Sequence, residues 1–111
     1  MRLVLSNLPP EHADRIAATL VEERLAACVN LLPVRSVYRW KGETCREDEI
    51  TAFIKVRADG VDALRRRLVE LHPYELPEVL ALPVDAAGSL EAYIQWVRAE
   101  SDGHPTGAGP A

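Results

Sequence analysis

The chain has 111 residues, 48% of them hydrophobic, and its 13 basic and 17 acidic side chains give a net charge of −4. This length predicts a single domain with enough apolar side chains for a core, and the acidic balance argues against a nucleic-acid partner, because phosphate contacts need a basic surface. No apolar run is long enough to span a bilayer, and the apolar N-terminal stretch is too short for a signal peptide, so we expect a cytoplasmic protein with no membrane partner.

The first half of the chain predicts a strand, a helix and a long β-hairpin. Residues 3–5 are a short apolar strand, and Pro9, Pro10 and Glu11 suit the first turn of a helix. Apolar residues recur at helical spacing after that turn: Ala13, Ile16, Ala17, Leu20, Val21 and Leu25. Residues 28–57 then form two strands folded back around residues 41–44, and each arm of roughly 14 residues would extend about 45 Å.

The second half predicts a helix, a buried strand, a further helix and a tail. Asp59 can cap the helix whose apolar stripe is Val61, Leu64, Leu68 and Leu71, and His72-Pro73 ends it. Residues 79–82 are a continuous apolar run, as expected for a strand buried on both faces. Ser89 caps a third helix with Leu90, Tyr93, Ile94 and Val97 inward. Residues 101–111 are expected to be a disordered tail.

The order β-α-β-β-α-β, followed by a helix, predicts an α+β ferredoxin-like domain over residues 1–100, with both helices on one face of an antiparallel sheet. The hairpin is longer than a domain of this size, which is about 30 Å across, so its outer half would leave backbone groups unpaired. Phe53 also points away from Ile54 and its core-facing neighbours. These features predict that another copy of the chain covers the sheet. Pro33 predicts a bulge or a break in the first arm. The alternative to an oligomer is a twisted hairpin with Phe53 as a surface aromatic.

The segment His72-Pro73-Tyr74-Glu75-Leu76-Pro77-Glu78 is the densest polar stretch of the chain. Its imidazole and carboxylates could bind a divalent metal, or His72 could act as a base oriented by Glu75. The alternative is a stiff loop in which His72 caps the preceding helix. No nucleophile or oxyanion donor accompanies the histidine, so we expect no catalytic residues and no enzyme.

The aromatic residues and the thiols add further candidates. Tyr38 and Trp40 share one face of the outer hairpin, where exposed aromatics favour a subunit contact or, with Tyr74, the wall of a cleft between subunits. Cys28, in apolar surroundings, and Cys45, facing about residue 39 near the hairpin tip, should be too far apart for a disulfide. Each thiol is a possible soft-metal ligand, although neither has the partners of a closed site.

Three blocks of the sequence, EERLAACVN at 22–30, SVYRWKG at 36–42 and HPYELPE at 72–78, resemble the CutA family of divalent-cation-tolerance proteins over about residues 2 to 98. The resemblance implies a ferredoxin-like subunit in a homotrimer whose long hairpins pair across subunits, with an architecture similar to the PII signalling proteins. It further implies a role in tolerance of copper and other divalent ions, and no established catalytic activity.

The family's proposed copper ligands are a cysteine at the end of the first strand and a His-His pair, and Ser6, Leu71 and His72 occupy these places here. Only His72 keeps a ligand side chain. We therefore expect weak binding of copper or another divalent cation through His72 and Glu75, without a tightly bound cofactor. The alternative function is a PII-like module that binds a small ligand or a signalling partner in clefts between subunits.

Overall fold

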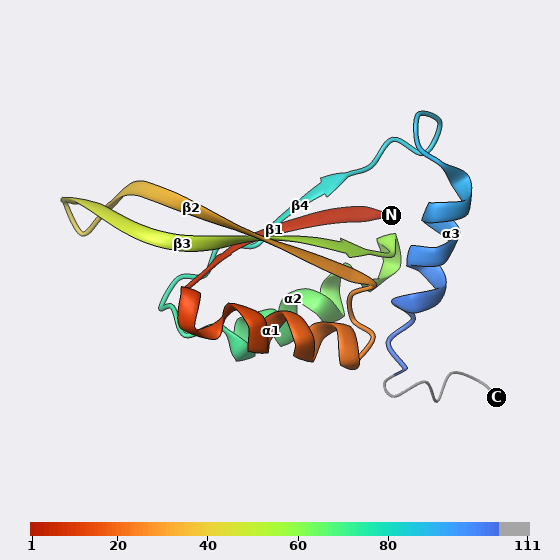
Figure 1. The fold of residues 1–111 in the computed structure, drawn as a ribbon, viewed down its shortest axis with the longest axis horizontal. Coiled ribbons are helices and arrows are strands. Elements are labelled where there is room, and N and C mark those ends of the chain that lie inside the picture. The colour runs from red at the N-terminus through yellow and green to blue at the C-terminus, as the bar shows by residue number, and fades with distance from the viewer. Residues whose placement is uncertain (105–111) are drawn as a thin grey trace.

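The structure is a computed structural model that describes residues 1–104. Seven of its elements follow the predicted order: β1 (Arg2–Leu8), α1 (Pro10–Glu22), β2 (Cys28–Trp40), β3 (Glu43–Val56), α2 (Val61–Leu71), β4 (Leu80–Pro83) and α3 (Glu91–Glu100). A short 3₁₀ helix that was not predicted, η1 (Ala58–Gly60), precedes α2. The strands form one antiparallel sheet in the order β2-β3-β1-β4. Helices α1 and α2 cover one face of this sheet and α3 lies at its end (Figure 1). The predicted ferredoxin-like α+β fold is confirmed.

The core lies between the sheet and the two covering helices. Alternation on the strands and helical spacing on α1 and α2 bring the predicted apolar side chains together, and Leu8, which lies beyond the predicted strand at 3–5, joins them. Each of the following is at most 3% exposed: Val4, Leu8, Ala13, Ile16, Leu20, Ala52, Ile54, Val56, Leu64 and Leu68. Full burial of one large aliphatic side chain contributes about 1.5–3 kcal/mol, so this layer supplies most of the apolar stabilisation within one chain.

The hairpin of β2 and β3 extends beyond the helices and gives the molecule its elongated shape of 50 × 31 × 21 Å (Figure 1). The predicted bulge or break at Pro33 is wrong, because the ladder runs without interruption and pairs Pro33 with Ile50. Counting back from the turn, Pro33 falls on a position whose backbone faces the free edge of β2, where a missing N–H is tolerated.

The turn of the hairpin is shorter than predicted. It consists of Lys41 and Gly42 alone, with φ of 50° and 81°, which is the two-residue arrangement that favours Gly at its second position. Cys45 therefore pairs with Tyr38 rather than with residue 39. This register fixes which side chains of the two arms share a face.

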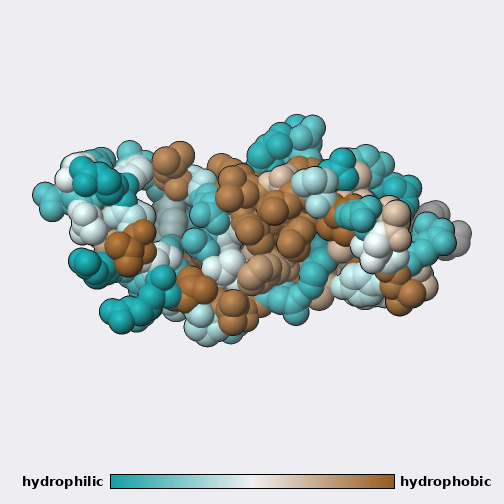
Figure 2. Space-filling view, turned by 90° about the horizontal axis from the view of Figure 1, so that it is seen from above, coloured by the Kyte–Doolittle hydropathy of each residue, from teal (hydrophilic) through white to brown (hydrophobic). Residues whose placement is uncertain are grey.

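The face of the sheet opposite the helices is apolar and open in the single chain. Leu5 pairs with Phe53 on β3 and with Leu80 on β4, and Leu3 pairs with Leu82. Figure 2 shows the resulting hydrophobic patch from above. The prediction that β4 is buried on both faces is wrong for one chain, because all four of its residues are exposed. We call the surface formed by Leu3, Leu5, Phe53, Leu80 and Leu82 the open sheet face.

Two predicted helix starts differ from the structure. Asp59 lies within the short η1 helix and pairs with Arg57 at 2.5 Å, so it does not cap α2. Ser89 does not cap α3, because the capping residue of that helix is Leu90. The Ser89 hydroxyl donates instead to the carbonyl of Asp85. The predicted inward positions of Leu90, Tyr93 and Val21 are wrong for one chain, because all three are exposed, and Val97 is the buried residue of α3. No helix within residues 1–104 is long and apolar enough to cross a membrane.

The chain remains folded past the predicted domain boundary. Ser101 is 2% exposed, and its hydroxyl accepts a hydrogen bond of 3.1 Å from the backbone N–H of Arg57. The N–H of Gly103 donates to the carbonyl of Arg24 at 2.9 Å. The predicted start of a disordered tail at Ser101 is therefore too early, and the rest of that predicted tail, 105–111, lies outside the described residues.

Candidate functional site

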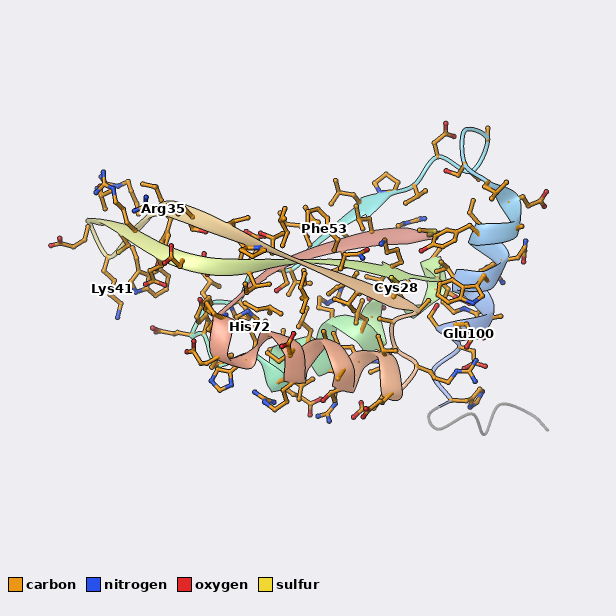
Figure 3. The ribbon with its side chains drawn as sticks, viewed as in Figure 1. Cys28, Arg35, Lys41, Phe53, His72 and Glu100 are labelled. Carbon is orange, nitrogen blue, oxygen red and sulfur yellow. The ribbon has the colours of Figure 1, made fainter. Side chains whose placement is uncertain are left out.

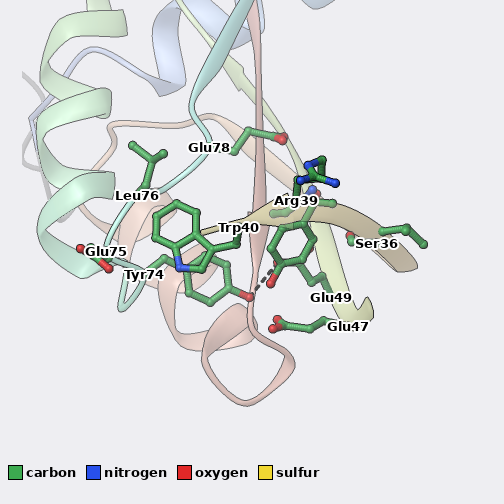
Figure 4. A pocket seen from close by; sticks show the side chains of 12 residues that line it. Ser36, Arg39, Trp40, Glu47, Glu49, Tyr74, Glu75, Leu76 and Glu78 are labelled. Atoms are coloured by element: carbon green, nitrogen blue, oxygen red, sulfur yellow. Dashed lines mark hydrogen bonds between the residues drawn. The ribbon is translucent and has the colours of Figure 1, made fainter. Parts of the chain in front are cut away.

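A pocket of about 640 Å³ lies between the outer half of the hairpin and the loop 72–78 that follows α2 (Figure 4). Its walls combine carboxylates with aromatic rings. The lining residues are Asn7, Ser36, Val37, Tyr38, Arg39, Trp40, Glu47, Glu49, Tyr74, Glu75, Leu76 and Glu78. We call this pocket the hairpin cleft.

The inner wall of the hairpin cleft is built on a bond between Tyr74 and Glu49. The Tyr74 hydroxyl donates to Oε2 of Glu49 at 2.7 Å, and Glu49 is 6% exposed. Burial, together with the Glu49 carboxylate, raises the pKa of Tyr74 well above its ordinary value of 10.0. The phenol therefore remains protonated and serves as the hydrogen-bond donor that a buried carboxylate requires.

The side chain of His72 holds the start of loop 72–78 against β1. His72 is 6% exposed. The backbone N–H of Tyr74 donates to Nδ1 at 3.2 Å, so Nδ1 is the acceptor and Nε2 carries the proton donated to the carbonyl of Asn7 at 2.9 Å. Burial lowers the pKa of His72 below 6.5. The imidazole is thus neutral and both of its nitrogens are engaged by backbone groups.

This geometry bears on both roles that the sequence suggests for His72. Its ring contacts β1 rather than the last carbonyls of α2, so the prediction of a helix-capping side chain is wrong, although its backbone N–H does bond Leu68. Neither ring nitrogen has Glu75 as its partner. The acid–base pair that a hydrolase would need is therefore not formed.

Glu75 and Trp40 lie at the outer rim of the cleft. Glu75 is exposed, and Oε2 of its carboxylate is 3.9 Å from Nζ of Lys41 in the hairpin turn. The same Nζ lies 5.8 Å from the centre of the Trp40 ring. The loop and the hairpin turn thus approach each other across the mouth of the cleft.

The structure brings three of the four predicted aromatic site residues together. Tyr38, Trp40 and Tyr74 line the hairpin cleft, whereas Phe53 lies on the open sheet face (Figure 3). The carboxylate of Glu47 beside Tyr38 raises the pKa of that phenol to about 12. Glu47 and Glu49 also act on Tyr74, so the two acids and two phenols form one cluster.

The sequence analysis did not identify Glu47 and Glu49 as site residues. One signal for them was present: alternation places both on one face of β3. The register pairs Glu47 with Ser36, two residues before Tyr38, so this face is the one that carries the two hairpin aromatics. The return of loop 72–78 onto that face has no signal in the sequence pattern.

The residues at the family's other ligand positions and the two thiols do not converge. Ser6 is fully buried on the helix-covered face, and Leu71 is an apolar residue packed against the core. Cys28 pairs with Lys55 and Cys45 with Tyr38, which places the two free thiols about 30 Å apart along the hairpin. Within residues 1–104, no three His, Cys, Asp or Glu side chains are grouped so that they could hold a metal ion.

The sequence matches one protein family over most of its length. Residues 2–100 match the family described as CutA1 divalent ion tolerance protein. The chain is 45% identical over 98 residues to the "Divalent-cation tolerance protein CutA" of Thermus thermophilus, covering 86% of this chain and 93% of that protein. It is 46% identical over 87 residues to the human "Protein CutA", covering 78% of this chain and 48% of the human one.

Solved structures show the same relationship. The structure of a "PII-like protein CutA from Nostoc sp. PCC 7120 in apo form" superposes with a TM-score of 0.89 at 53% identity, and the match covers 91% of this chain and 97% of that one. CutA from Xylella fastidiosa gives a TM-score of 0.85 at 43% identity, with 91% and 97% covered. The sequence and the fold therefore agree, and the chain belongs to the CutA1 divalent ion tolerance protein family.

Proposed function

We propose that the chain forms a homotrimer that contributes to divalent-cation tolerance in the cytoplasm by binding divalent ions weakly and reversibly, without catalysing a reaction. The names of its relatives support the tolerance role. The observation that carries the binding role is the carboxylate content of the hairpin cleft, where Glu47, Glu49, Glu75 and Glu78 face a single lining arginine, Arg39. Carboxylate oxygens are the ligands that hard divalent cations prefer.

Tight copper binding does not fit the residues present. Copper favours imidazole and thiolate ligands, but both nitrogens of His72 are engaged and Ser6 stands where the family carries a cysteine. Binding of a metal at His72 would have to break its bond with Tyr74 or Asn7. We therefore propose that His72 and Glu75 contribute at most to a weak site, with ligands from the cleft carboxylates or from a neighbouring subunit.

Two features support the homotrimer. The open sheet face is a continuous apolar surface on a single chain, and such surfaces mark contacts between proteins. Strands β2 and β4 are the edges of the sheet, and exposed edges pair readily with another chain.

Free Cys28 and Cys45 fit a reducing compartment such as the cytoplasm.

Calorimetric titration with copper and with magnesium tests the metal proposal on the wild-type protein, His72→Gln and Glu47→Gln. Gln at position 72 can still donate to the Asn7 carbonyl, so this variant tests ligation while the fold is kept. We expect dissociation constants on the order of 10⁻⁴ M or weaker, with weaker magnesium binding in Glu47→Gln. Equal heats from all three proteins would remove His72 and the cleft from the account.

A second candidate function is a PII-like module that binds a small molecule or signalling partner in the hairpin cleft. The volume of the cleft favours it, because pockets of about 300–1,000 Å³ are typical of small-molecule sites. The Nostoc relative is also described as PII-like. A thermal-shift screen with cationic, neutral and anionic metabolites tests this function, and a flat response across the panel would argue against it.

A further inference from the structure

We propose that the hairpin cleft binds an organic cation, namely an aliphatic amine with one or more ammonium groups, whose charge lies beside Glu49 and whose carbon chain packs on Trp40. This inference rests on the second function proposed above, ligand binding in the cleft, and assigns the chemical class of the ligand. Three properties of the cleft carry it: an uncompensated buried carboxylate, an aromatic wall and a volume far larger than an ion.

The charge of the cleft calls for a positive ligand. Glu49 is 94% buried, since its exposed fraction is 6%, and the partner of its carboxylate is the neutral hydroxyl of Tyr74. Within residues 1–104 no basic side chain forms an ion pair with it. The one lining arginine, Arg39, directs Nη2 to the carbonyl of Gly42 in the hairpin turn. A buried carboxylate without a counter-charge is unfavourable. A cation that enters the cleft would therefore be stabilised by pairing with Glu49.

The aromatic wall can accept the same charge. A cation over the face of an aromatic ring is attracted by its quadrupole, and Trp gives the strongest attraction. The chain already shows this contact, because Lys41 places its ammonium 5.8 Å from the centre of the Trp40 ring. Figure 4 shows the Trp40 and Tyr74 rings on the loop side of the cleft, with Glu49 bonded to Tyr74 behind them. An ammonium inside the cleft would therefore lie near both ring faces and carboxylates.

The size of the cleft separates an amine from a bare metal ion. A volume of about 640 Å³ suits a molecule of many heavy atoms, and no three metal-ligating side chains converge within residues 1–104. Anionic ligands would meet repulsion from four carboxylates, and neutral ligands would leave the charge of Glu49 uncompensated. An aliphatic amine satisfies the charge, the rings and the volume together.

The test is calorimetric titration of the full chain with spermidine, using 1,4-butanediol as a neutral counterpart and ATP as an anionic one. We expect spermidine to bind and the other two to give no heat. Glu49→Gln should weaken the binding of spermidine about 10-fold, which is equivalent to about 1.4 kcal/mol. The substitution keeps an acceptor for the Tyr74 hydroxyl. Trp40→Leu, at an exposed position, should weaken spermidine binding about 3-fold. Glu91→Gln, on α3 outside the cleft, should leave it unchanged.

Other outcomes would overturn the inference in distinguishable ways. Unchanged spermidine binding in both Glu49→Gln and Trp40→Leu would place the amine outside the cleft. If ATP binds and spermidine does not, and if ATP binding is lost in Trp40→Leu, the cleft is a ligand site but its ligand is not an amine. No heat with any of the three would refute the amine, while the thermal-shift panel decides separately whether the cleft binds other ligands.

Discussion

The hydroxyl of Tyr74 donates a 2.7 Å hydrogen bond to Oε2 of Glu49, and this bond fastens the loop after α2 to the third strand at the point where the hairpin leaves the domain. Glu49 is buried and Tyr74 is half-buried. The loop and strand are 25 residues apart in sequence, so the bond defines the inner wall of the hairpin cleft. Its loss should affect stability and the cleft together.

Tyr74→Phe is expected to lower the free energy of unfolding by about 1–3 kcal/mol. The substitution keeps the ring but leaves the buried Glu49 carboxylate without its donor, and an unsatisfied buried acceptor costs about this much. Urea unfolding at one fixed protein concentration measures the change, because the stability of an oligomer depends on concentration. Tyr38→Phe, at a largely exposed hydroxyl, is the matched control and should have a smaller effect. Equal losses in the two variants would contradict the assigned role of Glu49.

The stability of the protein should depend on pH through His72. Burial lowers the pKa of the folded-state imidazole below the ordinary value of 6.5, despite the opposing influence of Asn7 and Glu49. The unfolded chain therefore takes up this proton first as the solution is acidified. The contribution of neutral His72 is fully present above about pH 6.5 and is lost as the pH falls through that value towards the folded-state pKa.

Unfolding midpoints between about pH 7.5 and pH 5.5 measure this dependence. We expect the wild-type midpoint to fall more steeply with acidification than that of His72→Gln, in which the titrating group is removed. His12→Gln, at a partly exposed position on α1, should keep the wild-type slope. A wild-type slope in His72→Gln would show that the dependence comes from other groups.

Two buried serines should respond to alanine with opposite signs. Ser6 is fully buried, and its hydroxyl has no hydrogen-bond partner within the described residues. Ser101 is also buried, but its hydroxyl accepts from the N–H of Arg57 and donates to the carbonyl of Val97. Ser6→Ala should raise the free energy of unfolding by about 1 kcal/mol, and Ser101→Ala should lower it by about 1–2 kcal/mol. Each variant is the control for the other, and a loss in Ser6→Ala would point to a partner such as a buried water.

The contrast between Ser6 and Ser101 also shows what the sequence could predict. Ser6 lies in an alternating strand, so its place in the sheet follows from period-2 spacing, as do the core-facing residues Ala52, Ile54 and Val56. Ser101 follows the last helical residue in a stretch rich in Gly and Pro, which favours disorder. Its burial depends on a tertiary contact with Arg57, and a local pattern contains no information about that contact.

The same reasoning explains the outcome for β4 and for the cleft. An apolar run such as Leu80 to Leu82 looks the same whether the chain's own helices or another subunit cover it, so the sequence cannot assign the covering partner. The element order could be predicted because each element has its own periodicity and end signals. The hairpin cleft could not, because Glu49 and Tyr74 meet only when the loop folds back onto a strand whose register depends on a two-residue turn.

The open sheet face provides the test of the oligomer. Phe53 pairs with Leu5, which also pairs with Leu80, so a charge introduced at this position would lie in the middle of the apolar surface. If a neighbouring chain covers the surface, Phe53→Glu would bury an unpaired carboxylate in the contact, and such burial is strongly unfavourable. We expect light scattering to give about three times the 12.3 kDa of one chain for the wild type and a single-chain mass for Phe53→Glu.

The control introduces the same charge on the opposite layer of the molecule. Val69 is 48% exposed on α2, the helix that covers the other face of the sheet (Figure 1). Val69→Glu should therefore keep the wild-type mass. A wild-type particle of 12.3 kDa at micromolar concentration would contradict the homotrimer, because a lone chain would then leave both the open sheet face and the β2 edge in water. A wild-type mass in Phe53→Glu would instead move the contact to the strand edges, where backbone pairing does not depend on that side chain.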